Sequence, residues 1–91
     1  MLDKTARLEK VARRHPRTPL FARLADAYLS HGKSRRAREL CEEGCRRFPR
    51  YPTGFFVLSR CYEGEGRLEE ARAALDMGLR LDPHCPAAFR R

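Results

Sequence analysis

Features that define two large functional classes are missing from this sequence. It contains no apolar run near the roughly 18 residues that a membrane-spanning helix requires. The chain begins with a mixed, charged segment, Met1 to Thr5, and no apolar stretch follows it, which argues against a signal peptide. We therefore expect no membrane partner and a cytoplasmic location.

Recognisable catalytic patterns are also absent. No glycine-rich phosphate loop occurs, and none of the histidines has the helix-spaced histidine or carboxylate partner found in zinc hydrolases. His15, His31 and His84 all lie beside predicted turns, where a surface role is expected. We therefore expect no catalytic residue, no metal site and no cofactor, and we do not interpret the chain as an enzyme.

Four cysteines are present, but none belongs to the short CxxC turn typical of structural zinc sites. Cys41 and Cys45 are four residues apart and so share one helix face, while Cys61 lies in a neighbouring predicted helix. Without a secretory signal, reduced thiols packed as small apolar groups are the favoured interpretation. A metal or redox role for these three thiols stays open as the alternative.

The chain is basic, with 20 lysines and arginines against 12 acidic residues and a formal net charge of +8. This charge makes nucleic acid or another acidic polymer the alternative partner. The sequence disfavours it, because acidic residues interleave with the basic ones and no Phe or Tyr cluster provides a stacking platform. The first turn of the predicted helix 35–47 contains three arginines, Arg35, Arg36 and Arg38. They form either a basic docking surface or one side of a solvated series of ion pairs, an ion-pair ladder. Pairs such as Arg35–Glu39 and Arg38–Glu42 favour the ladder.

What the sequence does contain is an internal repeat of 34 residues. Phe21, Phe55 and Phe89 are evenly spaced at this interval (55 − 21 and 89 − 55). A fixed period in this range marks a repeat architecture, which usually binds a partner rather than catalysing a reaction. The same offset links further residue pairs: Leu24 with Leu58, Tyr28 with Tyr62, Gly32 with Gly66, Ala37 with Ala71, Gly44 with Gly78, and Pro49 with Pro83.

Each repeat predicts two helices joined by a glycine turn, because apolar residues recur at gaps of three and four on both sides of a glycine. Ser34 is expected to cap the helix after the first turn. Gly44 and Gly78 lie in mid-helix, where we expect them to make room for the next helix of the stack. The predicted helices span 3–14, 19–31, 35–47, 53–64 and 69–81.

The order of these residues resembles the tetratricopeptide repeat. Residues 18–51 carry Phe-x-x-Leu-Ala-x-Ala-Tyr followed by Gly, Arg-Ala, Gly and Pro, and residues 52–85 match the pattern more closely. Residues 1–17 resemble the second half of a degenerate repeat, and residues 86–91 resemble the start of a further helix. The resemblance implies an all-α fold in which tandem antiparallel helix pairs stack as a short right-handed solenoid. The first junction between units is one residue shorter than the later ones, which departs from the regular spacing.

In this family the first helix of each pair lines a concave groove that commonly holds an extended peptide or a partner helix. The resemblance therefore implies an adaptor or scaffold for a protein or peptide. We expect Phe56 to point partly into the groove, and Arg60 to pair with a partner carboxylate or with Asp26 across the groove. Some family members grip acidic chaperone tails through groove asparagines, which this chain lacks, so that activity is not expected. The expected groove residues are Ala22, Asp26, Leu29, Phe56, Arg60 and Glu63.

The last predicted helix presents an apolar edge formed by Leu75, Leu79 and part of Leu81, and the sequence stops one turn into a further helix. Repeat stacks need polar capping helices for solubility. We therefore expect either that these residues belong to a longer protein, which is the favoured interpretation, or that the domain forms a weak homodimer through this edge.

Overall fold

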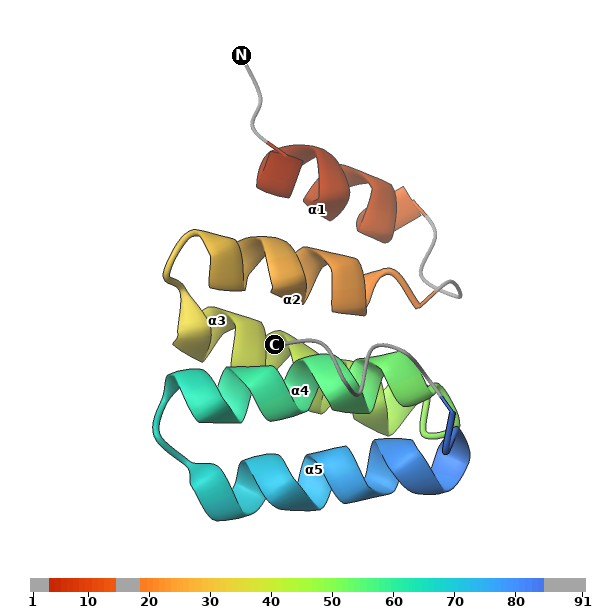
Figure 1. The fold of residues 1–91 in the computed structure, drawn as a ribbon. Coiled ribbons are helices and arrows are strands. Elements are labelled where there is room, and N and C mark those ends of the chain that lie inside the picture. Colours follow the sequence, from red (N-terminus) through yellow and green to blue (C-terminus); the bar gives the residue numbers. More distant parts are fainter. Residues whose placement is uncertain (1–3, 15–18, 85–91) are drawn as a thin grey trace.

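A computed structural model describes residues 4–14 and 19–84, and the regular structure in these residues is entirely helical. This confirms the all-α prediction, and the described helix ends agree with the predicted ones within two residues. The helix expected to begin within residues 86–91 lies outside the described residues. The five helices are α1 (Lys4–Arg14), α2 (Phe21–Ser30), α3 (Ser34–Arg47), α4 (Pro52–Gly64) and α5 (Leu68–Leu81) (Figure 1).

The turns within the two helix pairs are copies of each other. Gly32 and Gly66 adopt the left-handed conformation, with φ of +74° and +76°, which costs little only for glycine. In the first turn the Lys33 amide donates to the Tyr28 carbonyl at 2.9 Å, and in the second the Arg67 amide donates to the Tyr62 carbonyl at the same distance. This hydrogen bond closes a helix end that terminates at glycine. The 34-residue offset therefore preserves the geometry of the turn as well as its sequence.

The start of α3 differs from the prediction. The helix begins at Ser34 itself, so Lys33 occupies the N-cap position, and no side chain caps the helix there. The prediction that Ser34 caps the helix is therefore wrong. The Ala37 amide, one turn into α3, donates to the Lys33 carbonyl instead.

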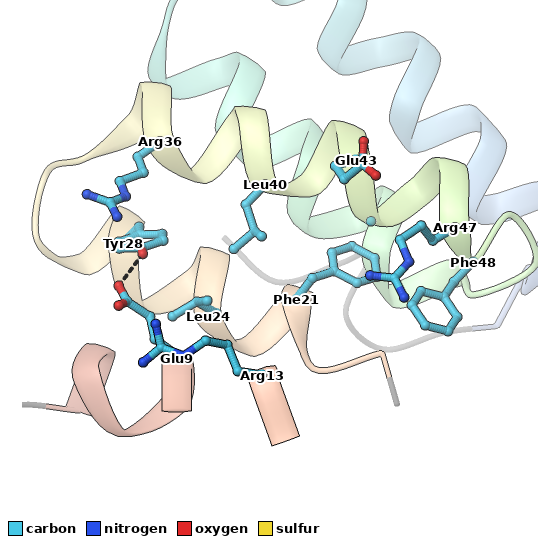
Figure 2. Close-up of a pocket in the computed structure, with 11 residues that line it drawn as sticks. Glu9, Arg13, Phe21, Leu24, Tyr28, Arg36, Leu40, Glu43, Arg47 and Phe48 are labelled. Carbon is cyan, nitrogen blue, oxygen red and sulfur yellow. Dashed lines mark hydrogen bonds between the residues drawn. The ribbon is translucent and has the colours of Figure 1, made fainter. Parts of the chain in front are cut away.

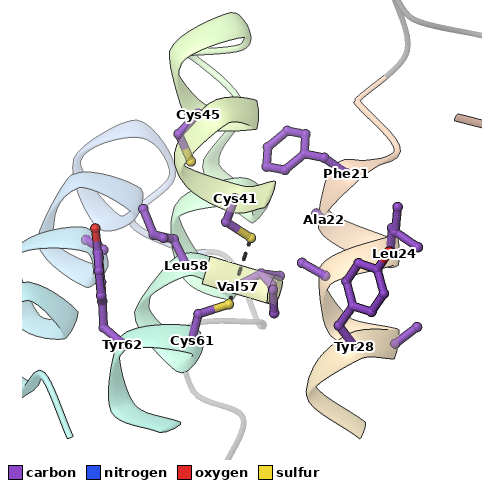
Figure 3. Close-up of a cluster of buried hydrophobic side chains, with 14 of the residues drawn as sticks. Phe21, Ala22, Leu24, Tyr28, Cys41, Cys45, Val57, Leu58, Cys61 and Tyr62 are labelled. Atoms are coloured by element: carbon purple, nitrogen blue, oxygen red, sulfur yellow. Dashed lines mark hydrogen bonds between the residues drawn. The ribbon is translucent and has the colours of Figure 1, made fainter. Parts of the chain in front are cut away.

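Small side chains let α2, α3 and α4 approach closely in the core (Figure 3). Ala25 and Ala37 are completely buried, as are Cys41 and Cys61. Each of these residues lies where two helix faces meet, and a larger side chain would hold the faces apart. The core of each pair is therefore built from alanine and cysteine, with aromatic and aliphatic residues surrounding them.

The mid-helix glycines make room for aromatic rings of their own helix pair. The ring of Phe21 occupies the space that a side chain at Gly44 would need, and it also lies against Gly54. A β-carbon at Gly78 would lie 2.5 Å from Cε1 of Phe56. The expectation that the next helix in the stack fills this space is wrong, because the preceding helix of the same pair already does so.

The helices form a layered stack in which first helices touch and second helices do not. α2 contacts both α3 and α4, and α4 contacts α5, whereas in the described part of the chain α3 makes no contact with α5. α1 packs only on α2 among the described helices, where the Tyr28 hydroxyl donates a hydrogen bond to the Glu9 carboxylate (Figure 2). The first helices α2 and α4 therefore contact each other directly, whereas α1, α3 and α5 make no contact with one another in the described structure.

Candidate functional site

The first helices of the two pairs present a linked pair of opposite charges. Asp26 on α2 and Arg60 on α4 form an ion pair, with 3.0 Å between Oδ1 and Nη2. Their side chains are 53% and 46% exposed, so water and other molecules reach both. Of the two pairings left open for Arg60, the structure contains the one with Asp26.

Two further expected groove residues flank this ion pair. Leu29 lies on α2 and is half-buried, and Glu63 lies on α4 and is exposed. Both follow the ion-pair residues by three positions (29 − 26 and 63 − 60), so each lies about one helical turn further along the same face. The face therefore combines an acid, a base, an aliphatic side chain and a second acid.

The other two expected groove residues, Ala22 and Phe56, are buried. Their exposed fractions are 2% and 3%. The ring of Phe56 lies against Gly78 of α5, while Phe55 is only partly buried at the margin of the core. The expectation that Phe56 points partly into a groove is therefore wrong, because the glycine on the facing helix makes room for its ring inside the pair.

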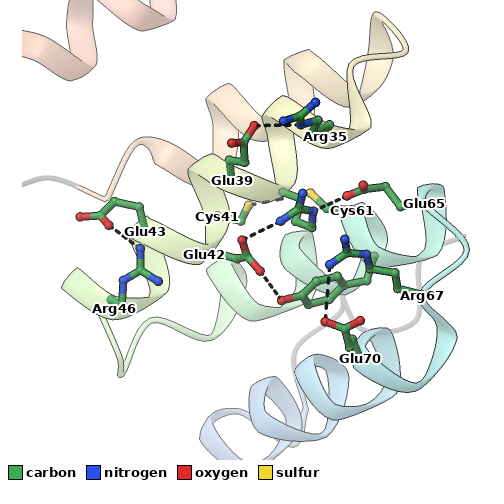
Figure 4. Close-up of polar contacts among 12 residues, drawn as sticks. Arg35, Glu39, Cys41, Glu42, Glu43, Arg46, Cys61, Glu65, Arg67 and Glu70 are labelled. Carbon is green, nitrogen blue, oxygen red and sulfur yellow. Dashed lines mark hydrogen bonds and ion pairs between the residues drawn. The ribbon is translucent and has the colours of Figure 1, made fainter.

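Arg38 leaves the expected basic surface of α3 to join a partly buried polar network. Figure 4 shows two other members of this network, Glu42 and Glu65. The Arg38 guanidinium donates to the Glu65 carboxylate in the α4–α5 turn and, at 2.9 Å, to Glu42. Only 15% of its side chain is exposed, so it is not available as part of a docking surface. Glu42 also accepts a hydrogen bond from the Tyr62 hydroxyl at 2.8 Å, and burial together with this bond raises the pKa of Tyr62 to about 12.

The other two arginines of the basic surface remain exposed. Arg35 pairs with Glu39 at 3.8 Å, which confirms one predicted rung of the ion-pair ladder, and the Arg38–Glu42 contact confirms another. Arg36 turns toward α2, and its guanidinium carbon lies 5.1 Å from the centre of the Tyr28 ring. The three neighbouring arginines thus have three different environments, which their shared helical turn did not indicate.

The three described cysteines are free and buried. Cys61 Sγ lies 4.0 Å from Cys41 Sγ, across the interface of α3 and α4. Burial raises the pKa of the Cys45 thiol to about 12, with a smaller contribution from Cys61. The Cys41 pKa is also raised, by its contact with Cys61 and by burial. Within residues 4–14 and 19–84, no group of three or more His, Cys, Asp and Glu side chains is placed to hold a metal ion.

The expected apolar edge of α5 has mixed exposure. Leu75 and Leu79 are half-buried, and Leu81 is 37% exposed. Leu68 and Met77, on the same helix, are 68% and 41% exposed. Apolar surface on this outer helix is therefore accessible in the described structure.

The repeat geometry agrees with a comparison to known families. A model of the tetratricopeptide repeat matches residues 22–86, which is more than two thirds of the chain. The chain belongs to the tetratricopeptide repeat family. No curated protein matches the chain. Tetratricopeptide repeats generally mediate protein–protein interactions and are typically non-catalytic modules. In the described residues, no helix combines the length and the apolar character needed to cross a bilayer.

A cavity that the sequence did not reveal lies on another face of this tetratricopeptide repeat, between α1, α2 and α3. The residues that line it come from these three helices and from Phe48, which follows α3, and in the sequence each of them occupies an ordinary core or surface position. The Tyr28–Glu9 hydrogen bond that ties α1 to α2 is the counterpart of the Tyr62–Glu42 hydrogen bond between α4 and α3. Tyr28 and Tyr62 are 34 residues apart, whereas Glu9 and Glu42 are 33 apart (42 − 9), because the first junction is one residue shorter. Only the spacing of the helices shows this cavity.

Proposed function

We propose that this tetratricopeptide repeat chain is an adaptor or scaffold that holds a peptide or helix of a partner protein against the α2–α4 face. The observation that carries the proposal is the exposed Asp26–Arg60 ion pair, which spans the two first helices. An exposed pair of this kind stabilises the fold by only about 0–1 kcal/mol. Asp26 and Arg60 can therefore separate and bind charged or polar groups of a partner with little loss of folding free energy.

The neighbouring side chains fit this role. Leu29 offers an apolar contact on one side of the pair, and Glu63 offers an acceptor on the other. Opposite charges held at fixed positions select the direction of a bound segment, since reversing the segment places like charges together. The proposed binding residues are therefore Asp26, Leu29, Arg60 and Glu63, whereas Ala22 and Phe56 are buried and do not belong to this surface.

Affinity capture with mass spectrometry tests this proposal when the wild type is compared with Arg60→Glu. We expect Arg60→Glu to lose partner proteins that the wild type retains, because it places two like charges across the face. Arg72→Glu is the matched control, since Arg72 is exposed on α5, which makes no contact with α2 in the described structure. Identical sets of captured proteins for all three chains would contradict the α2–α4 face as the binding surface.

The alternative partner is nucleic acid or another acidic polymer. Of the basic surface on α3, Arg35 and Arg36 are exposed, whereas Arg38 is engaged by Glu42 and Glu65. This reduces the charge available to phosphates. Binding to generic RNA that weakens steeply with added salt, and that Arg35→Glu/Arg36→Glu abolishes, would support the alternative. A cytoplasmic location stays a prediction of the sequence.

Self-association through α5 is the second interaction that we propose. Its apolar residues Leu75, Leu79 and Leu81 are at least partly accessible, and a second copy of the helix would cover them about a two-fold axis. We expect sedimentation velocity to show weak dimerisation that rises with concentration and is lost in Leu79→Glu. A monomer at all concentrations, unchanged by this substitution, would show that the edge makes no such contact.

A further inference from the structure

The cavity between α1, α2 and α3 has an apolar interior (Figure 2). Its volume is about 430 Å³, within the usual range for ligand pockets of about 300–1,000 Å³. It exists because α1 and α3 both pack on α2 without contacting each other in the described structure. Phe21 and Leu24 of α2 line it together with Leu40 of α3 and Phe48, the residue that follows α3, and the latter two are only partly buried.

The mouth of this cavity is basic. Three exposed arginines stand around it: Arg13 from α1, and Arg36 and Arg47 from α3. Two of them are held over the apolar lining by aromatic rings, Arg36 at 5.1 Å from the Tyr28 ring centre and Arg47 at 5.8 Å from that of Phe48. Stacking on a ring attracts the cation without burying it.

The two carboxylates at the cavity are already engaged. Glu9 accepts a hydrogen bond from Tyr28, and Glu43 forms an ion pair with Arg46 at 2.6 Å. The ion pair with Arg46 offsets the charge of Glu43, whereas the hydrogen bond from the neutral Tyr28 hydroxyl leaves the charge of Glu9 in place. The lining therefore carries three arginines against two carboxylates and is net positive. The whole chain, with a formal net charge of +8, adds a long-range attraction for acidic molecules.

We propose that this cavity is a second binding site, which takes one bulky apolar side chain of an acidic peptide segment from a partner protein. The apolar side chain displaces water from the lining of Leu24 and Leu40, and acidic residues beside it in the segment face the arginines at the mouth. The lining residues of α2 follow Phe21 at intervals of three and seven positions, on a different face of the helix from Asp26. The site is therefore distinct from the α2–α4 face proposed above.

An acidic peptide fits these observations better than nucleic acid does. A phosphate backbone would use the arginines but would leave the apolar lining unfilled. A neutral apolar peptide would use the lining but not the three cations. Only a segment that combines an apolar anchor with flanking carboxylates uses both parts of the cavity.

The test uses a fluorescent peptide with one phenylalanine flanked on both sides by aspartates and glutamates. A second peptide of the same charge has alanine in place of the phenylalanine. We expect the phenylalanine peptide to bind the full chain in anisotropy titrations at least about five-fold more tightly than the alanine peptide, because apolar burial is lost in the latter. Amide chemical shifts should change around Leu24 and Leu40 on binding.

Matched variants separate the site from general charge attraction. Arg36→Glu should weaken binding of the phenylalanine peptide by about five-fold or more, whereas Arg35→Glu, with the same change in net charge on the adjacent residue, should have a clearly smaller effect. Leu40→Trp fills the cavity and should also weaken binding. Arg60→Glu should leave binding nearly unchanged, because it lies on the other face. Thermal melts establish that each variant is folded.

Several outcomes would overturn the proposal. They are no measurable binding of the phenylalanine peptide, equal binding of the alanine peptide, or equal weakening by Arg35→Glu and Arg36→Glu. Displacement of the peptide by a single-stranded oligonucleotide that itself binds with a steep salt dependence would identify a surface for acidic polymers instead. Loss of binding in Arg60→Glu, with no effect of Leu40→Trp, would place the peptide on the α2–α4 face.

Discussion

At the scale of single residues, each helix pair depends on an aromatic ring lying against a glycine. Phe21 fills the space beside Gly44, and Phe56 fills the space beside Gly78. At an offset of 34 residues the counterpart of Phe21 is Phe55, yet the ring that lies against Gly78 is that of Phe56. The ring–glycine contact is therefore made by non-equivalent phenylalanines in the two pairs. One physical difference accompanies this exchange: α2 begins at Phe21 itself, whereas α4 begins three residues before Phe55 (55 − 52).

Gly78→Leu is expected to destabilise the domain by at least about 1 kcal/mol through overpacking against Phe56. This loss should exceed the gain in helix propensity of about 1 kcal/mol that accompanies replacement of glycine. Ala73→Leu, at an exposed position of the same helix, should be nearly neutral. Urea unfolding of both variants measures the difference, and equal stability of the two would show that the ring moves aside without cost.

The buried thiols make stability depend on alkaline pH. Burial raises the pKa of Cys45 from near 9 to about 12. Between these values the folded chain holds a proton that the unfolded chain has lost, so stability falls as pH rises, by about 1.4 kcal/mol per pH unit for one such group. Below about pH 9 this contribution is fully present.

Cys45→Ala removes one of these groups. We expect its free energy of unfolding, measured in urea with a reductant present, to fall less steeply than that of the wild type as the pH rises from about 9 to 11. The Cys41 and Tyr62 contributions remain in both proteins and therefore cancel in the comparison. Parallel pH profiles for the two proteins would mean that Cys45 ionises in the folded state as easily as in the unfolded chain.

At the scale of helices, the two pairs are joined by a polar bridge as well as by the core. Arg38 of α3 reaches the turn between α4 and α5 through Glu65, and Tyr62 of α4 reaches back to α3 through Glu42. Glu42 receives bonds from both Arg38 and Tyr62, so the bridge is continuous. This arrangement fixes the position of the second pair relative to the first.

Arg38→Ala should therefore cost about 1–2 kcal/mol of stability, because it leaves two partly buried carboxylates without their cation. Arg35→Ala should cost less than about 0.5 kcal/mol, since that side chain is 82% exposed and its ion pair is solvated. Chemical denaturation of the two variants provides the measurement. Similar losses from both would show that the bridge adds little beyond a surface ion pair.

At the scale of the whole molecule, α1 is the more weakly attached of the two end helices. Among the described helices α1 contacts α2 alone and α5 contacts α4 alone, with a larger contact for α5, whereas α2, α3 and α4 each contact at least two others. The same arrangement leaves the arginine-rimmed cavity open between α1 and α3. A helix with few neighbours opens with a lower free energy than the helices of the core.

Hydrogen exchange should therefore show faster exchange for the amides of α1 than for those of α3 and α4. Tyr28→Phe, which removes the hydrogen bond to Glu9, should speed exchange in α1 while changing exchange in α4 much less. Uniform protection across all five helices, before and after the substitution, would show that the domain unfolds as one cooperative unit.

Local patterns in the amino-acid sequence were enough to predict the helices, their turns and the family. Apolar spacing predicts all five described helices, and the 34-residue offset predicts the two glycine turns, because both patterns depend on interactions between residues close in the chain. The predicted Asp26–Arg60 pair also followed from repeat symmetry, which places equivalent positions of α2 and α4 side by side.

Which of two neighbouring side chains is buried depends on contacts between helices, and the sequence pattern did not predict it. Phe55 and Phe56 are adjacent and chemically identical, and the choice between them depends on Gly78 of the facing helix. Arg36 and Arg38 share one turn, yet one stacks on Tyr28 and the other is enclosed by two carboxylates from different segments. The cavity likewise depends on the distance between α1 and α3. These features arise from contacts between residues far apart in the sequence, and periodicity within one helix contains no information about them.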